Sequence, residues 1–431
     1  MHRKPLSVKL LRMGRRRERG AIAVLVALSL VALIGAVGLA LDLGKLYVVK
    51  SELQNSADSC ALAAVRDLTG ATIDLSVPEA AGITAGHANY KFFQSSPVQL
   101  TVNSSVTFSD SLSNPFLPKT SVTNPSTMKY VKCTTSLANV PNWFIQVLDM
   151  LPGVSIANAS VSSFAVAQLG PSQTTCAIPV FVCTKGTSPT YSVSHTIGEW
   201  VASKSGASPA FGPGNFGWAA LDGSDSANSI KNELTSNYCS MPAVGSSIGT
   251  TGNKVADASA YNTRFGIYSG SYTQSGATPD FTGYAYTKAY TWSSGSNAYS
   301  GDNGTGSTSN FISERAKFAA YQGDSAVFGN GNGGTGNGSS SSTNYTLGAD
   351  RRLALAPEVD CSVLGTSGTH QMPILWWDCV LMLDPMQSTG QAGPVHLEYE
   401  GKSTDASVPC ATHGTPGDSH SVGPRVPVLI Q

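Results

Sequence analysis

Charged residues are scarce in this chain of 431 residues and make up only 13% of it. Lysine plus arginine and aspartate plus glutamate each total 27, but 8 of the basic residues and 1 of the acidic ones lie within the first 19 positions. The rest of the chain is therefore mildly acidic, which argues against nucleic acid as a partner. No paired carboxylates suited to acid–base catalysis stand out, and no cofactor or small-molecule substrate is indicated. Glycine, serine, threonine and asparagine are abundant instead, which favours an exported, loop-rich protein over a cytosolic enzyme.

A long apolar run covers residues 21–43, and its one charge, Asp42, stands near its end. About 20 apolar residues in a helix cross a bilayer core, so this run predicts a transmembrane helix. The basic residues in the tail of residues 1–20 should stay in the cytoplasm, which places everything after Asp42 on the other side. The alternative is a cleaved secretory signal, but its apolar core would be shorter, about 7–15 residues, and we expect an uncleaved anchor.

Small residues follow one another at short helical steps inside this run. They are Ala32, Gly35, Ala36 and Ala40. Such a face lets a second membrane helix approach closely, although a generic alanine-rich anchor has the same composition. Both interpretations stay open.

The helical pattern continues past the membrane as a predicted amphipathic stalk, residues 44–69. Apolar and small residues recur there at steps of three and four, which indicates one apolar stripe. The stripe consists of Leu46, Val49, Leu53, Ala57, Cys60, Ala64 and Leu68. It can pack either on the protein's own exported domain or on neighbouring subunits, and Thr69-Gly70 supplies a stop signal.

All eight cysteines lie beyond the apolar run. An even number in an oxidising compartment predicts disulfides. Cys176 and Cys183 flank a short apolar segment and are the first expected pair, and two of Cys361, Cys379 and Cys410 should pair in the C-terminal third. Cys60 is either a packed thiol or a link from the stalk to the exported domain.

The exported part has β-rich patterns, so the expected fold class is α+β: one transmembrane helix, a stalk and a disulfide-stabilised β-rich domain. Strands are predicted over residues 98–108, 129–136 and 154–166, with a short helix that Pro141 opens. Beyond the stalk we expect four regions. These are a small α+β region (70–170), a Gly/Ser/aromatic-rich region (171–327), a flexible Gly/Asn/Ser loop (328–350) and a β-rich end (351–431).

Two short motifs carry possible chemistry. Asp222, Ser224 and Ser226 alternate as oxygen ligands of a divalent cation would, which suggests a cation-dependent adhesive module, while turn-forming residues that cap the next helix have the same pattern. Ser247 lies in a Gly-x-Ser-x-Gly sequence, as the nucleophile of a serine hydrolase does. The residues that follow, Thr250 to Asn253, are poor helix formers, which speaks against a hydrolase.

The N-terminal seventy residues resemble a known module. The stretches that carry the resemblance are Arg19 to Val24, Val37 to Gly44 with its Asp-Leu-Gly ending, Leu53 to Asp58 with its Leu-Gln start, and Ala61 to Ala64. They are similar to the N-terminal module of TadG-like proteins of the tight-adherence (Flp) pilus assembly system of bacteria. The segment from Pro141 to Val161 and the C-terminal third resemble the larger members of that group more loosely.

The resemblance implies a single-pass protein of the bacterial inner membrane with a cytoplasmic N-terminus and a periplasmic C-terminal domain. Its role would be structural, in pilus assembly, with other pilus-assembly membrane proteins and pseudopilin-like subunits as partners. Processed pilins are cut after a glycine and usually carry glutamate at the fifth position beyond it. Gly20 is present, but Leu25 stands at that fifth position. A membrane-retained component is therefore expected rather than a fibre subunit.

Overall fold

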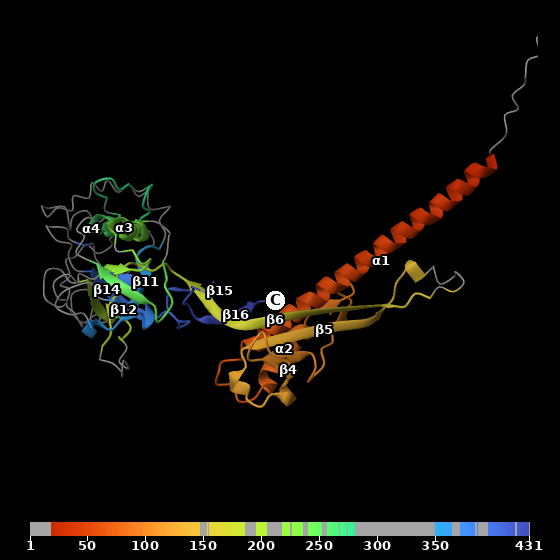
Figure 1. Cartoon of the computed structure of the whole chain (residues 1–431), viewed down its shortest axis with the longest axis horizontal. Helices are drawn as coiled ribbons and strands as arrows, with labels where there is room; N and C mark the ends of the chain where they lie inside the picture. The colour runs from red at the N-terminus through yellow and green to blue at the C-terminus, as the bar shows by residue number, and fades with distance from the viewer. Residues whose placement is uncertain are drawn as a thin grey trace, which may run out of the picture. The chain divides into compact units, whose positions relative to one another are not determined.

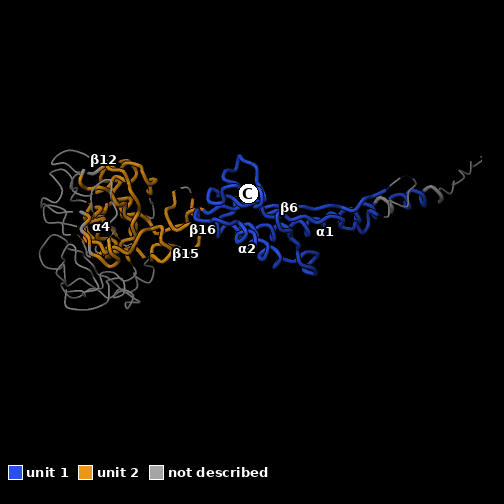
Figure 2. The backbone as a smooth tube through the Cα atoms, turned by 90° about the horizontal axis from the view of Figure 1, so that it is seen from below, with its two compact units in different colours: residues 1–169, 427–431 blue, residues 170–426 orange. Residues whose placement is uncertain are grey.

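The protein consists of two compact units with separate hydrophobic cores (Figure 2). Unit 1 comprises residues 1–169 and 427–431, and unit 2 comprises residues 170–426. The computed structural model describes residues 19–146, 153, 155–185, 195–204, 218–224, 226–235, 240–251, 257–266, 268–273, 275–280, 350–363, 371–383, 386, 395–418 and 420–430. The expected loop at 328–349 lies outside these residues.

Unit 1 begins with the long helix α1 (Arg19–Val65), which joins the predicted span and stalk without a break (Figure 1). No proline interrupts it, so each interior residue keeps the N–H that the helix ladder needs. Within it, Ile22–Val65 is long and apolar enough to cross a membrane. Large apolar side chains are exposed along the span, whereas the stripe is buried from Val49 onward. These findings confirm the predicted long N-terminal helix.

The remainder of unit 1 is a second helix and a small antiparallel sheet, both packed on the stalk half of α1. Helix α2 (Ser76–His87) is followed by a two-stranded ribbon, and the sheet has the order β6-β5-β3-β4, with β16 paired to β6. The strands are β1 (Tyr90–Lys91), β2 (Ser96–Pro97), β3 (Val106–Ser109), β4 (Leu117–Pro118), β5 (Tyr130–Val140), β6 (Ala159–Thr174) and β16 (Arg425–Leu429). Two 3-10 turns, Lys119–Ser121 and Pro125–Thr127, connect β4 to β5.

The strand expected over residues 98–108 is shorter in the structure, where only 106–109 is extended as β3. The backbone turns over residues 101–105, with the Ser105 N–H donating to the Thr101 carbonyl. Asn103 adopts a φ of +62° there, a left-handed conformation that asparagine tolerates better than most residues and that interrupts a strand. The strand expected over 129–136 continues to 140 as β5, because it stays paired with β6. The strand expected over 154–166 begins later, at 159, and runs on to 174 as β6, where its end pairs with β15.

Unit 2 is built on a five-stranded sheet of order β7-β11-β13-β14-β8 and a three-stranded sheet of order β12-β10-β9. All neighbours are antiparallel except β7 and β11. The end of β6 pairs with β15 (Ala411–Pro416). The other elements are β7 (Val182–Cys183), β8 (Trp200–Lys204), β9 (Trp218–Ala220), α3 (Ala227–Thr235), β10 (Ser247–Thr251), α4 (Asp257–Thr263), β11 (Leu353–Val359), the 3-10 turn Cys361–Val363, β12 (Gln371–Pro373), β13 (Trp376–Met382) and β14 (Val395–Lys402).

Every residue of β11 is buried because both faces of its sheet are covered. Successive side chains of a strand point to opposite faces. Accordingly, Ala354 and Ala356 belong to the core formed with α3 and α4, whereas Leu353 and Leu355 belong to the core formed with the three-stranded sheet. The larger sheet therefore lies between helices and a second sheet.

The disulfides of unit 2 differ from the expected pairing at Cys183, which bonds Cys361 rather than Cys176. The chain between Cys176 and Cys183 runs along β11, where Ala177 is bridged to Leu355 and Cys183 pairs with Val359. The partners of these two positions on β11, Leu355 and Val359, are four residues apart, which is about 13 Å along an extended strand. Cys176 and Cys183 are therefore held too far apart for a disulfide. Cys176 is itself disulfide-bonded, and Cys379 bonds Cys410.

Candidate functional site

The point where the predicted span becomes the stalk holds the candidate site, and it is centred on Asp42. The Asp42 carboxylate is only 4% exposed and accepts hydrogen bonds from three consecutive backbone N–H groups. These donors are Trp143 at 2.8 Å, Phe144 at 3.0 Å and Ile145 at 2.8 Å. Free N–H groups at the start of a helical turn point the same way and favour a negative charge. Asp42 thereby fastens a segment about a hundred residues away to α1.

Lys45, one turn further along α1, binds the same segment from its other side. Its Nζ donates to the Pro141 carbonyl at 2.7 Å and lies 4.1 Å from the centre of the Trp143 ring. An ammonium group over an indole ring gains a further electrostatic attraction. Asp42 and Lys45 together hold both the N–H groups and a carbonyl of residues 141–146, which we call the aromatic foot.

Gly38 allows the aromatic foot to approach the helix backbone. A Cβ at Gly38 would lie 2.8 Å from the Phe144 Cβ, whereas one at Gly35 would meet nothing within 4 Å. Gly35, Ala36 and Ala40, the predicted small-residue face, are exposed. The Ala32 side chain lies outside the described residues.

The stalk half of α1 is locked onto unit 1. The side chains of Leu53, Ala57 and Cys60 are fully buried, and Val49 lies with them, while Leu46 is half-buried. The stripe thus packs on the protein's own domain, which is one of the two expected alternatives.

Polar groups of α1 reach its neighbours as well. The Thr135 hydroxyl on β5 donates to the Leu53 carbonyl at 3.0 Å, and the Ser56 hydroxyl donates to the Gly86 carbonyl at 2.9 Å. Gln54 donates through Nε2 to Asp58 at 2.7 Å and to the Phe164 carbonyl at 3.0 Å. These bonds fix the rotation of the helix relative to the sheet.

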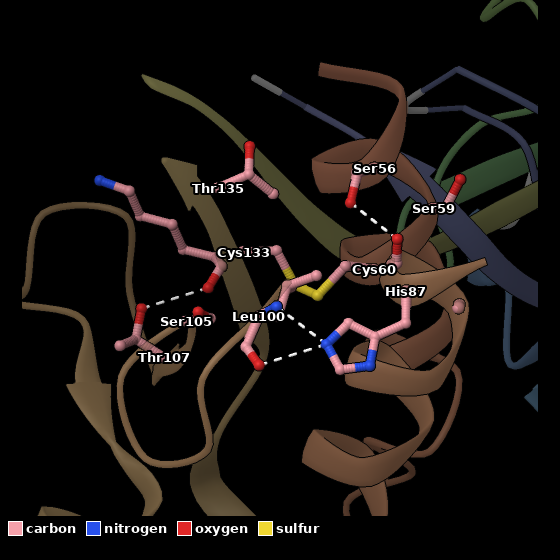
Figure 3. The surroundings of a disulfide bond; sticks show 12 residues. Ser56, Ser59, Cys60, His87, Leu100, Ser105, Thr107, Cys133 and Thr135 are labelled. Atoms are coloured by element: carbon pink, nitrogen blue, oxygen red, sulfur yellow. Dashed lines mark hydrogen bonds between the residues drawn. A yellow bond between two sulfur atoms is a disulfide. The ribbon is translucent and has the colours of Figure 1, made fainter. Parts of the chain in front are cut away.

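A disulfide completes this packing (Figure 3). Cys60 on α1 bonds Cys133 on β5, with a Cα–Cα distance of 6.0 Å. Helix α2 lies close against the same turn of α1, because a Cβ at Gly82 would be 3.0 Å from both the Ala64 Cβ and the Cys60 carbonyl. Cys60 therefore links the stalk to its own domain, which the sequence had left undecided.

The comparison with protein families falls on this helix. Residues 20–67 match the family model described as "Putative Flp pilus-assembly TadE/G-like". The chain carries a TadE/G-like N-terminal module. The match supports a role related to Flp pilus assembly. No curated protein and no solved structure matches the chain.

The module's recognisable residues make specific contacts. Asp42 binds the aromatic foot. Leu53 packs in the core of unit 1, and Gln54 donates to the Phe164 carbonyl of β6. Sequence reasoning selected Asp42 and Leu53 as packing residues but missed Lys45 and the partners in the aromatic foot. A carboxylate near the end of an apolar run needs N–H donors, and the short helix predicted from Pro141 would offer them. Nothing in the sequence, however, indicates that Asp42 and this distant segment come together.

Outside the TadE/G-like module, the Asp222 motif is engaged locally. The Asp222 carboxylate accepts a hydrogen bond from the Ser224 N–H at 2.8 Å and another from the Ser229 hydroxyl. The Ser226 hydroxyl accepts the Ser229 N–H at 3.1 Å, as the cap of α3. This geometry is that of a helix cap. Among the described residues, no group of three or more His, Cys, Asp or Glu side chains could hold a metal ion.

Ser247 also has a structural place. It lies in strand β10 and pairs with Pro373 of β12. A nucleophile elbow places its serine on a sharp turn between a strand and a helix. The Gly-x-Ser-x-Gly sequence does not form that turn here.

Unit 2 contains buried acids whose protonation is perturbed. Burial, together with the hydrogen bond and the charge of Glu358, raises the pKa of Asp378 well above its ordinary value. Burial also raises the pKa of Glu233 to about 7, and the charge of Asp222 adds to that effect against a hydrogen bond with Ser240. Both acids lie inside the fold, so these shifts make the stability of unit 2 depend on pH.

Proposed function

We propose that the protein is a membrane-anchored structural component of a tight-adherence (Flp-type) pilus assembly system and acts by protein packing. The observation that carries this proposal is the TadE/G-like match at residues 20–67, combined with an apolar helix long enough to cross a membrane. The module's residues serve to hold α1 rigidly on unit 1. That rigidity suits a scaffold better than a catalyst.

The proposed location is the bacterial inner membrane, with one crossing. The cluster of basic residues before residue 21 supports a cytoplasmic N-terminus and a periplasmic location for unit 2 and for the part of unit 1 that follows Leu43. The disulfides support an oxidising compartment for both units. Thiol-reactive labels added to whole spheroplasts should reach engineered cysteines in unit 2 and in unit 1 after the stalk, but not one placed at residue 10.

The proposed partners are other pilus-assembly membrane proteins and pseudopilin-like subunits. The large apolar side chains that the structure describes between residues 22 and 43 are exposed in the isolated chain, which leaves this surface for lipid or for partner helices. Leu25 in place of the glutamate of processed pilins supports a component that stays in the membrane.

The test is deletion of the gene followed by complementation. Deletion should abolish surface pili, and the wild-type gene should restore them. Asp42→Ala should restore them poorly, because the aromatic foot loses three hydrogen bonds, whereas Asp222→Ala is the matched control on an exposed acid and should restore them fully. Normal pili in the deletion strain would refute the proposal.

A cation-dependent adhesive module built on Asp222, Ser224 and Ser226 is the alternative. Calcium or magnesium would then raise the melting temperature of the protein, and Asp222→Ala would remove that rise. The helix-cap geometry of these residues predicts no such response.

A further inference from the structure

The aromatic foot lies alongside the predicted membrane span rather than beyond it. Phe144 contacts α1 at Gly38, which is five residues before the end of the apolar run at Leu43. Five residues of helix correspond to about 7 Å along its axis. Phe144 therefore sits at a depth that belongs to the outer boundary of the bilayer.

The side chains of the aromatic foot have the chemistry of that boundary. Trp143 is 59% exposed and Phe144 is 44% exposed, and Leu39 and Leu43, which follow the contact residues Gly38 and Asp42 in α1, are exposed as well. Tryptophan prefers the membrane–water interface, where its apolar body is shielded and its N–H stays wet. The Lys45 ammonium is paired at the same level, because it lies over the Trp143 ring and donates to the Pro141 carbonyl.

The backbone of the aromatic foot is also prepared for a medium that is poor in water. Non-helical backbone at membrane depth is tolerated only where its polar groups are satisfied by protein or water. Asp42 accepts three of the N–H groups, and Lys45 donates to the Pro141 carbonyl. The Asn142 side chain in turn donates to the Ala157 carbonyl at 3.0 Å.

We propose that the aromatic foot inserts into the outer interface of the bilayer and forms a second membrane contact next to α1. The occupant of its exposed face is lipid, at the boundary between headgroups and acyl chains. The inference rests on the proposed membrane anchorage of α1. Two contacts at one side of the membrane would fix the tilt and rotation of unit 1, which a single helix alone leaves free.

The test uses the full-length protein in phosphatidylcholine vesicles whose acyl chains carry bromine either near the headgroup or near the chain end. Bromine quenches tryptophan emission on contact. The bromine near the headgroup should quench part of the emission, and Trp143→Phe should remove that quenched part. Trp376→Phe, in unit 2, is the matched control and should leave the quenched part of the emission unchanged.

Two further measurements separate the possible failures. Flotation of the vesicles reports anchorage alone, so a protein that does not float overturns the anchorage and with it the proposal. A protein that floats but shows the same quenching with and without Trp143 overturns the aromatic foot as a lipid contact and leaves its face for a protein partner. Formation of the Cys60–Cys133 disulfide in Trp143→Phe checks that the variant has folded.

Discussion

Two buried acids of unit 1, Asp42 and Glu79, and two of unit 2, Asp378 and Glu233, have different surroundings. In unit 1, Asp42 accepts hydrogen bonds from three backbone N–H groups. Glu79 accepts a hydrogen bond from the Asn103 N–H at 2.7 Å and forms an ion pair with Lys119 at 2.6 Å. In unit 2, Asp378 and Glu233 have raised pKa values because burial is not balanced by such donors. These acids of unit 1 connect distant segments by accepting hydrogen bonds, whereas Asp378 and Glu233 of unit 2 retain their protons more readily.

The difference teaches that the two acids Asp378 and Glu233 make the stability of unit 2 depend on pH. A carboxyl group whose pKa is raised by folding binds more protons in the folded state than in the unfolded state. Its contribution is therefore favourable in mild acid and is lost as the pH rises. Unit 2 should lose stability between mildly acidic and neutral pH through Glu233, and the raised pKa of Asp378 acts in the same direction.

The largest expected effect comes from the disulfide of unit 1. Replacing both Cys60 and Cys133 with alanine opens a loop of 73 residues, and the free energy of unfolding of unit 1 should fall by about 4 kcal/mol. Urea unfolding of the full chain in detergent, followed by a probe in each unit, measures it. The matched control removes Cys379 and Cys410, which close a loop of 31 residues in unit 2. A shift of both units in either variant would show that the two units unfold together.

The pH comparison is sharpened by Glu233→Gln. The pKa of Glu233 is about 7 in the folded protein against an ordinary value of 4.5, so its ionisation costs stability as the pH rises from about 4.5 to 7. The variant should be about 3 kcal/mol more stable than wild type at pH 8 and nearly unchanged at pH 4. Glu79→Gln in unit 1 should instead destabilise, because it weakens two charge-assisted bonds. Thermal melts at both pH values measure the differences, and a pH-independent gain would contradict the assignment.

The contact between α1 and α2 can be broken by a single side chain. Gly82→Val places atoms against the Ala64 Cβ and the Cys60 carbonyl, where even a Cβ would be only 3.0 Å away. Overpacking of this kind should cost unit 1 about 1–3 kcal/mol. Ala80→Val, on the exposed face of the same helix, should cost less than about 1 kcal/mol and serves as the control in denaturant unfolding. Equal costs would show that α2 is not closely packed on α1.

The smallest expected effect is that of Gln54→Ala. The variant loses the bonds to Asp58 and to the Phe164 carbonyl, both partly accessible to water. A loss of about 0.5–1.5 kcal/mol in unit 1 should result, with no change in unit 2. The same unfolding experiment measures it, with Asn55→Ala on the exposed face as the control. A larger loss would mean that Gln54 sets the rotation of α1.

Much of unit 1 could be predicted because its signals are local or periodic. The apolar run and the stripe from Val49 to Ala64 follow the helical period, and they fix the length of α1 and the face it buries. The match of the aromatic foot to Asp42 could not be predicted. Asp42 and the aromatic foot are about a hundred residues apart in the chain, and the sequence around one does not specify the other as its partner.

The cysteines show the same limit. The sequence predicts that they form disulfides in an oxidising compartment, but spacing alone does not decide the partners. Cys183 bonds Cys361, 178 residues away, because β7 and β11 run side by side. A pair that is close in sequence, Cys176 and Cys183, is held apart by the extended chain between them.

The sequence by itself therefore determined the long helix, its apolar span, its buried stripe and its TadE/G-like pattern, because these depend on the helical period and on neighbouring residues. Only the tertiary structure decided that the stripe packs on the protein's own sheet, that Cys60 bonds Cys133 and that Asp42 holds the aromatic foot. Each of these is a contact between distant segments. Such contacts form only where the complete fold brings complementary shapes and hydrogen-bonding groups together.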